Sequence, residues 1–186
     1  MKKIIVVLCF ISSLAIANAQ SFDGVPIDGL LKTCVTKYQA KGYKLKSYYE
    51  SGAIMTGRIN SDAIELNIVK TPKSGIVWKV VVSFPERTSW DFLHNDYETY
   101  FSIIKNKYGH PETSYSYFKS PYELGDGYEM TAVRVDKCKY IAFWDATEMS
   151  IFLEITKWAQ VTMHYESTKN VEIKRREEEQ INSSKF

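Results

Sequence analysis

The sequence lacks the short motifs that mark the common catalytic sites. No serine stands in a Gly-x-Ser-x-Gly turn, no His-Glu-x-x-His zinc pattern occurs, and no glycine-rich loop has the spacing that binds phosphate. Acidic pairs such as Asp145 and Glu148 suit glycosidic chemistry, but a chain with 22 acidic residues contains many such pairs by chance. A non-enzymatic binding protein is therefore the leading hypothesis. The alternative is a secreted hydrolase of a family that these motifs do not mark.

An excess of positive charge is also missing. The chain has 24 basic and 22 acidic residues, and the first 19 residues hold two of the basic ones, so the remainder is formally neutral. Nucleic-acid-binding domains rely on surplus Lys and Arg gathered on one face. We therefore expect no nucleic-acid partner and little attraction to anionic lipid, and no motif predicts a cofactor.

The one long apolar run stands at the N-terminus. Lys2 and Lys3 precede an apolar segment that extends to Ile16, and the small residues of Ala17-Asn18-Ala19 follow it. This is the pattern of a secretory signal peptide cleaved after Ala19, and the run is too short to span a bilayer stably. Cys9 lies inside the apolar segment, so it does not mark a lipoprotein cleavage site. We expect a periplasmic or secreted protein.

Cysteine is scarce. Beyond the leader only Cys34 and Cys138 remain. An oxidising compartment would permit a disulfide between them. Cys34 lies on the apolar stripe of a predicted helix and Cys138 beside a predicted hairpin turn, which are also places for small buried hydrophobic residues. The sequence leaves both interpretations open.

The first half of the mature chain predicts one helix and four strands. Asp28 is a candidate N-cap, the apolar residues after it recur at helical spacing, and Gly42 ends the pattern. Strand-like runs follow at 43–49, 53–59, 63–71 and 76–84, separated by short turn sequences. Such short connections make neighbouring strands antiparallel, because a parallel return needs a crossover of a dozen or more residues.

The same order then starts again. A second helix begins at Trp90 and ends at Gly109, with apolar residues spaced three and four apart. Strand-like runs follow at 113–118, 128–135, 138–146, 150–156 and 161–166, and a loop from Pro121 to Gly127 interrupts them. Residues 169–186 carry mixed charge and little apolar periodicity, which indicates a frayed helix or a charged flexible tail.

These patterns predict an α+β fold for residues 20–168. It consists of two tandem helix-plus-antiparallel-meander units, about 28–86 and 87–168, with both helices packed on one face of a curved sheet. The duplication is inferred from element order alone. The helix residues expected to be buried against the sheet are Leu31, Val35, Trp90, Tyr97, Phe101 and Ile104.

From Asp28 to Glu166 this order resembles the β-lactamase-inhibitor-protein-like fold, whose members are exported proteins built from two helix-plus-four-strand repeats. The resemblance is architectural and carries no motif, so it transfers no functional residue. It implies binding by the open face of the sheet, or envelope maintenance as a structural accessory. TATA-binding-protein-like and cystatin-like arrangements share enough of the order to remain alternatives.

The titratable candidates for a metal site are weak. His94 has Asp91 and Glu98 at helical spacing but no second histidine, and His110 and His164 stand apart. In the loop, Glu123, Asp126 and Glu129 suit calcium by residue type, but their spacing matches no calcium loop. Ordinary turn and surface chemistry accounts for both groups, so we predict no metal site.

Aromatic residues supply the candidate binding site. The chain holds 13 tyrosines and 4 tryptophans, more than the predicted core positions use. Tyr122 and Tyr128 flank the predicted loop, and Trp158 occupies a predicted turn. Because exposed aromatic side chains are common anchors at interfaces, we expect these three residues to contact a protein or glycan partner in the envelope or outside the cell.

Cleavage after Ala19 makes Gln20 the first residue of the exported protein. Intact-mass measurement or N-terminal sequencing of the exported form checks this expectation, because the small-x-small site directly follows the apolar run. Retention of Cys9 in the exported form would contradict it.

Overall fold

The computed structural model describes residues 21–184, so the predicted signal peptide and its cleavage site lie outside the described residues. In chain order the elements are β1 (Ser21–Phe22), β2 (Val25–Pro26), α1 (Leu31–Ala40), β3 (Lys44–Tyr49), β4 (Gly52–Ile59), β5 (Asp62–Lys70), β6 (Val77–Ser83), α2 (Trp90–Tyr108), β7 (Thr113–Phe118), α3 (Glu129–Arg134), β8 (Cys138–Ala146), β9 (Met149–Ile155), β10 (Val161–Ser167) and α4 (Thr168–Ser183).

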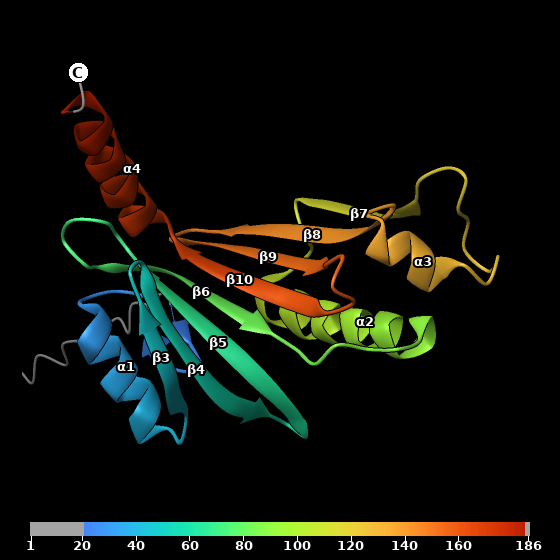
Figure 1. The fold of residues 1–186 in the computed structure, drawn as a ribbon, viewed down its shortest axis with the longest axis horizontal. Helices are drawn as coiled ribbons and strands as arrows, with labels where there is room; N and C mark the ends of the chain where they lie inside the picture. Colours follow the sequence, from blue (N-terminus) through green and yellow to red (C-terminus); the bar gives the residue numbers. More distant parts are fainter. Residues whose placement is uncertain (1–20, 185–186) are drawn as a thin grey trace, which may run out of the picture.

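Eight strands form one antiparallel sheet in the order β3-β4-β5-β6-β10-β9-β8-β7 (Figure 1). The first half of the chain supplies β3 to β6 and the second half supplies β7 to β10. The last strands of the two halves, β6 and β10, pair at the centre from Thr162 opposite Ser83 to Glu166 opposite Lys79. The predicted α+β class and the antiparallel order of the strands are confirmed.

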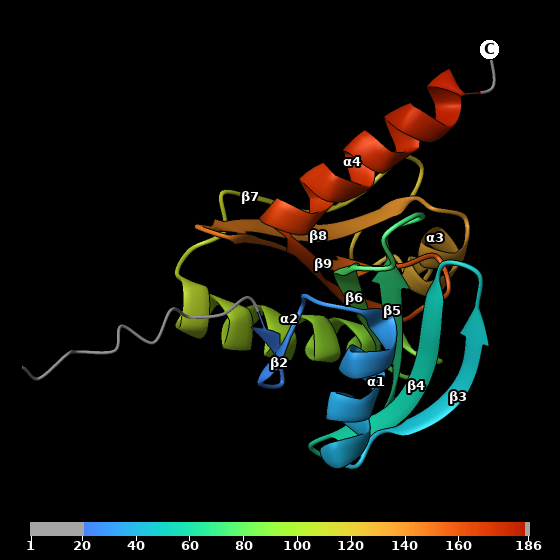
Figure 2. The same cartoon turned by 90° about the vertical axis from the view of Figure 1, so that its left-hand side faces the viewer.

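Helices α1 and α2 lie on one side of this sheet, here called the inner face, and α4 lies on the other side (Figure 2). Alternate residues of the six central strands point toward the helices and are buried, as period-2 strands with one covered face require. The largest fully buried side chains on the inner face of the sheet are Met55, Leu66, Ile68, Trp144, Ile151 and Leu153.

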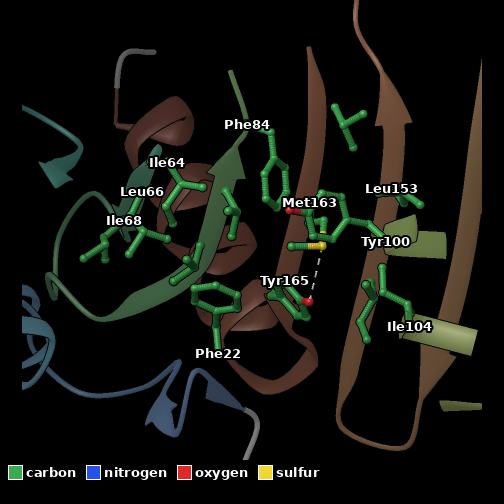
Figure 3. Packing of buried hydrophobic residues seen from close by; sticks show 14 of the residues in the cluster. Phe22, Ile64, Leu66, Ile68, Phe84, Tyr100, Ile104, Leu153, Met163 and Tyr165 are labelled. Atoms are coloured by element: carbon green, nitrogen blue, oxygen red, sulfur yellow. Dashed lines mark hydrogen bonds between the residues drawn. The ribbon is translucent and has the colours of Figure 1, made fainter. Parts of the chain in front are cut away.

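The hydrophobic core runs without interruption across both halves. Figure 3 shows Ile64, Leu66 and Ile68 of β5 on one side of the seam and Leu153, with Ile104 of α2, on the other. Between them Met163 and Tyr165 of β10 point into the same layer. One core of this kind makes the stability of each half depend on the other.

The N-terminal lead-in forms a small hairpin of β1 and β2 that seals the core at the seam. The Phe22 ring lies 5.2 Å from the ring of Tyr165 on β10, and its carbonyl accepts a 3.3 Å hydrogen bond from the hydroxyl of Tyr38 on α1. Phe22, Val25 and Ile27 are all buried. The lead-in therefore joins the first helix to the last strand.

Helix α2 follows the predicted apolar stripe. Tyr97 and Ile104 are buried, and Trp90 and Phe101 are partly buried against the core. The helix ends at Gly109, whose φ of 88° lies in the left-handed region that glycine enters without strain. In α1, Val35 is buried and Leu31 partly buried. The N-cap of α1 is Leu30, without a side-chain cap, so the expectation of Asp28 as the cap was wrong.

Arg87 fastens the connection between the halves. This residue lies in the segment between β6 and α2, its Nε donates to Asp96 of α2 at 2.6 Å, and its Nη2 donates to Asp62 of β5 at 3.0 Å. The hydrogen bond from Arg87 to Asp96 is the main reason why the pKa of the guanidinium is raised. One cation thus links a strand of the first half to the helix of the second.

The segment expected as a strand at 128–135 is helix α3, so the prediction of two helices was wrong. Strands β7 and β8 pair directly with each other up to Phe118 opposite Cys138, which leaves residues 119–137 outside the sheet. Backbone groups that no neighbouring strand can satisfy must pair locally, and a helix does this. The neighbours Ala132 and Val133 are both buried, a pattern that a two-residue period does not give.

Of the two alternatives for the C-terminal segment, a frayed helix and a flexible tail, the structure has a helix, because residues 168–183 form α4. The hydroxyl of Ser167 accepts the amide hydrogen of Asn170 and caps the helix. Arg175 pairs with Glu172 at 2.8 Å and with Glu179 at 2.7 Å, one turn away on each side. Mixed charges without apolar periodicity therefore formed a helix through a cap and pairs at i, i+3 and i, i+4.

Two polar side chains fix α4 to the rest of the chain. The amide nitrogen of Asn170, which is fully buried, donates to the carbonyls of Ile27 at 3.1 Å and Val77 at 2.9 Å. The carboxylate of Glu177 accepts hydrogen bonds from the backbone of Lys73 at 2.6 Å and of Ser74 at 3.2 Å, and from the Ser74 hydroxyl. Burial raises the pKa of Glu177, but these hydrogen bonds outweigh it and hold the pKa below its ordinary value.

Trp78 does not join the inner core, although strict alternation with the buried Val80 and Val82 along β6 would place it there. The register between β5 and β6 shifts where Lys70 pairs with Val77, and this bulge sets Trp78 out of the alternation. The Trp78 ring instead lies under α4, with the ammonium of Lys174 5.0 Å from its centre. It lines a groove of about 360 Å³ between α4 and the ends of β5 and β6.

Cys34 and Cys138 are both free and buried, so the disulfide that the sequence left open is not formed. The two residues lie in α1 and at the start of β8, in different halves. Burial raises the pKa of the Cys34 thiol to about 11 and that of Cys138 to about 12, so neither thiol is ionised at neutral pH. Both act as small apolar side chains of the core.

Residues 21–184 include no helix that is long and apolar enough to cross a membrane.

The buried stripe of α2 offers a matched pair of substitutions. Ile104→Ala removes a side chain that is 2% exposed and should lower the free energy of unfolding by roughly 2 to 5 kcal/mol, because it leaves a cavity in the shared core. Ile103→Ala, at a position 49% exposed, should change it by less than about 0.5 kcal/mol. Urea unfolding measures the free energy of unfolding of both variants. An equal decrease in the two would contradict the assignment of Ile104 to the buried face of α2 and Ile103 to its exposed face.

The attachment of α4 should depend on the charge of Glu177. Glu177→Ala leaves the amides of Lys73 and Ser74 without partners, so we expect roughly 1.5 to 3 kcal/mol less protection of α4 in hydrogen exchange. Glu179→Ala removes an exposed ion pair with Arg175 and should cost less than about 1 kcal/mol.

The same contact should weaken in acid. Because the pKa of Glu177 is lowered in the folded protein, its contribution is complete above the ordinary carboxyl pKa and is lost as the pH falls through the lowered value. Exchange protection of α4 should therefore fall on acidification, and the Glu177→Gln variant should lack this part of the pH dependence. An identical pH profile in the variant would contradict the assignment.

Candidate functional site

The face of the sheet opposite α1 and α2, here called the outer face, is the candidate binding surface. Its side chains alternate with the buried ones, and the register places them in rows across the strands. They are Ile54 and Thr56 on β4, Glu65, Asn67 and Val69 on β5, Lys79, Val81 and Ser83 on β6, Thr162, His164 and Glu166 on β10, Ser150, Phe152 and Glu154 on β9, Ile141 and Phe143 on β8, and Tyr115 and Tyr117 on β7. All of these except Thr162 are half-buried or exposed.

His164 lies at the centre of the outer face, on the strand that joins the two halves. Its Nε2 lies 3.1 Å from the hydroxyl of Thr162 and 3.5 Å from a carboxylate oxygen of Glu154. The ring of Phe152 meets the imidazole edge-on, with centres 5.3 Å apart. Neighbouring strands therefore gather an imidazole, a hydroxyl, a carboxylate and an aromatic ring within one row and its diagonal neighbours.

This cluster does not have the geometry of a nucleophile, base and acid relay. In such a relay one imidazole nitrogen takes the proton of the hydroxyl while the other nitrogen donates to the carboxylate. Here Thr162 and Glu154 both contact the same nitrogen, Nε2 of His164. The arrangement therefore suits hydrogen bonding to a partner rather than activation of the Thr162 hydroxyl.

The charges of the outer face pair with one another. Lys79 and Glu166 form an ion pair of 2.7 Å next to His164, and Lys46 and Glu65 form another of 2.7 Å toward β3. A shallow depression of about 290 Å³ lies between these groups, lined by Lys79, Phe143, Ser150, Phe152, His164 and Glu166. Because each of these cations has an anionic neighbour, the centre of the face has little net charge.

Toward β7 the outer face becomes aromatic. Ile141 lies opposite Tyr115, and Phe143 lies opposite Phe152. Tyr115 is 53% and Tyr117 47% exposed, and their rings meet edge to face at 6.3 Å. Tyr115 and Tyr117 are not among the three predicted site residues, although their alternation with Ser114 and Ser116 in the sequence is typical of solvent-facing side chains.

The three predicted site residues lie elsewhere, at the end of the molecule where α3 and the turn between β9 and β10 approach each other (Figure 1). Tyr128, at the N-cap of α3, is 63% exposed, Trp158 is 67% exposed, and Tyr122 is half-buried. Trp158 lines a depression of about 340 Å³ with Glu86, Arg134 and Lys157. Among the described residues no ring contact joins any two of the three predicted anchors.

The acidic residues of the loop bind its own backbone. Asp126 accepts the amide hydrogens of Glu123 at 2.9 Å and of Tyr128 at 2.7 Å, and Glu129 accepts that of Gly125 at 2.7 Å. Their carboxylates hold the turn that leads into α3 instead of converging on one point. Within residues 21–184 no three His, Cys, Asp or Glu side chains cluster as metal ligands.

The other histidines serve the surface of α2 and the loop after it. The His94 ring stacks on Trp90 at 5.1 Å, and its Nε2 lies 3.4 Å from Glu98. His110 is exposed directly after the helix. None of the three histidines was a predicted site residue, and for His164 the strand register is what brings Glu154 close.

Comparison of the chain with models of protein families, with curated proteins and with solved structures gives no match.

Proposed function

We propose that this protein is an exported recognition domain that binds a protein partner with the outer face of its sheet. The observation that carries the proposal is the asymmetry of the sheet. One face packs on α1 and α2, while the other presents half-buried aromatic, aliphatic and hydrogen-bonding side chains around His164. Aromatic residues with polar neighbours are the usual composition of the centre of a protein interface.

The charge of the face favours a neutral protein surface as the partner. Lys79 with Glu166 and Lys46 with Glu65 neutralise each other, so no row of free cations runs across the strands to meet phosphate groups. The edge-to-face packing of Tyr115 and Tyr117 does not give two coplanar rings on which a sugar could lie. Burial of Phe143 and Phe152 by a protein partner would contribute more to the binding free energy than a sugar on these tyrosines, since aromatic anchors dominate interface energies.

The same proposal accounts for the architecture. We infer that the two halves are duplicated units, each a helix followed by four antiparallel strands, joined through their last strands. Duplication yields a wide sheet with the leading helix of each unit, α1 and α2, on one face, and the part of the opposite face that α4 does not cover is then available for binding. The resemblance to the β-lactamase-inhibitor-protein-like fold implies the same use of an open sheet face, and export through the predicted signal peptide agrees with such a role.

A hydrolase is the weaker candidate. The polar cluster on the outer face lies in a shallow depression, and its hydroxyl and carboxylate contact the same nitrogen of His164. Enzymes that use an imidazole base close it in a pocket with an activated nucleophile on one side and an orienting group on the other. A binding face requires neither feature.

Site-specific photo-crosslinking tests the proposal. A benzophenone amino acid at Phe152, in the centre of the outer face, should form an adduct with an envelope protein in living cells. The same probe at Phe92, which is 67% exposed on α2, reports on the opposite layer and should not form that adduct. Adducts from Phe92 alone, or from neither position, would overturn the proposal.

Substitutions then measure the contribution of the face. With the crosslinked partner purified, His164→Ala and Phe152→Ala should each weaken binding at least about tenfold, which corresponds to about 1.4 kcal/mol. Phe92→Ala should leave the affinity unchanged, and all three variants should retain cooperative unfolding. Loss of binding in Tyr128→Ala and Trp158→Ala, with none in the outer-face variants, would move the site to the end of the molecule that carries α3.

A further inference from the structure

The two edges of the eight-stranded sheet differ in how they are protected. Edge strands expose unpaired backbone groups, and proteins commonly protect them with lysines or bulges. Strand β3 has both: Lys44 and Lys46 stand on it, and its register against β4 shifts between Leu45 and Ser47. This edge therefore resists pairing with another strand.

Strand β7 has no such protection. Its six residues, Thr113 to Phe118, include no charge, proline or glycine, and all six pair with β8 in unbroken register. The residues from Thr113 to Tyr117 are exposed. On the inner side Ser114 and Ser116 are exposed, whereas the Phe118 ring lies 5.1 Å from the ring of Trp90 on α2, so the strand extends beyond the helix layer from Ser116 toward Thr113.

The ladder shows which backbone groups of β7 are free. The amide of Lys119 donates to the carbonyl of Lys137 at 2.7 Å, in the register that pairs Phe118 with Cys138. Hydrogen-bonded positions alternate along an antiparallel pair, so Tyr115 and Tyr117 direct their backbone groups to β8. Ser114, Ser116 and Phe118 direct theirs away from the sheet.

We propose that β7 pairs antiparallel with β7 of a second copy of this chain, about a two-fold axis at Ser116. In this register Ser116 lies opposite Ser116 of the partner subunit, and the free backbone groups of both strands bond to each other. Tyr115 then lies opposite Tyr117 of the partner subunit as a non-hydrogen-bonded pair, the type whose side chains approach most closely. Four tyrosines meet on the outer side of a continuous sheet.

A second copy fits this edge for reasons of charge and symmetry. The strand is uncharged, so two copies meet without the repulsion that the lysines of β3 would cause. The strand is self-complementary about a two-fold axis at Ser116, because Tyr115 meets Tyr117 of the partner subunit on one side of the sheet. On the other side Ser116 meets its own counterpart, and Ser114 lies opposite Phe118 of the partner subunit. The dimer also places both outer faces on the same side, although the inference does not depend on what that face binds.

Cysteine crosslinking tests the axis directly. Oxidation of the Ser116→Cys variant should give a covalent dimer, because paired residues in a ladder have Cα atoms about 5.5 Å apart, within the range of a disulfide. Ser114→Cys should not crosslink, since the two copies of position 114 are displaced by about 13 Å along the strands. Ser47→Cys on β3 is the matched control on the protected edge, and the native Cys34 and Cys138 are buried.

Sedimentation of the mature chain, residues 20–186, tests the assembly without crosslinks. The wild-type chain should shift from monomer to dimer as its concentration is raised to about 1 mM. Ser116→Pro should be monomeric yet folded, because it removes an amide that bonds only across the dimer and proline is tolerated at such edge positions. Ser116→Thr keeps the amide and should remain dimeric.

Three outcomes would overturn the inference. These are a wild-type monomer over the whole concentration range, crosslinking through Ser47→Cys in place of Ser116→Cys, and a dimer that persists in Ser116→Pro. Failure here leaves the proposed function untouched, since that is decided by crosslinking at Phe152 and not by the oligomeric state.

Discussion

The pairing of β6 with β10 is the interaction on which the rest of this structure depends. Each half of the chain ends its meander with one of these strands, and their antiparallel ladder makes one sheet of eight strands from two of four. A four-stranded sheet with one helix buries little apolar surface, whereas the joined sheet buries a single core that includes both helices. The hairpin at Phe22 and the Arg87 ion pairs reinforce the same seam.

The seam also creates the candidate binding face. His164 and Thr162 belong to β10 itself, Glu154 and Phe152 lie on one neighbouring strand, and Lys79 lies on the other. The pairing of β9 with β10 brings the first four of these residues together, and the pairing of β6 with β10 adds Lys79 from the other half. Position in the sheet, not proximity in sequence, determines which side chains a partner would meet.

Helix α4 shows how a charged segment without an apolar stripe obtains a fixed place. Its contacts are polar: Asn170 binds the carbonyls of Ile27 and Val77, and Glu177 binds the turn at Lys73 and Ser74. Buried hydrogen bonds of this kind give a definite orientation, since a misplaced helix would leave the same groups unpaired. The helix stands over Trp78 at one end of the outer face, and the opposite end runs on to the unprotected edge at β7.

The sequence by itself determined the local structure, and the tertiary structure decided the rest. Apolar periodicity and turn residues were sufficient to predict α1, α2 and all eight strands of the large sheet within a few residues. These signals depend only on residues that are close together in the sequence. The segment that became α3 could not be assigned, since a short apolar run has no definite period and only the pairing of β7 with β8 excluded it from the sheet. The fixed position of helix α4 could not be predicted, because Glu177 finds its partners about a hundred residues away in the chain. Binding by the open face of the sheet was an expectation, but the residues that meet on that face were not. Lys79 lies beside Glu166 only because β6 pairs with β10, and no local pattern encodes the register of strands so far apart in the chain.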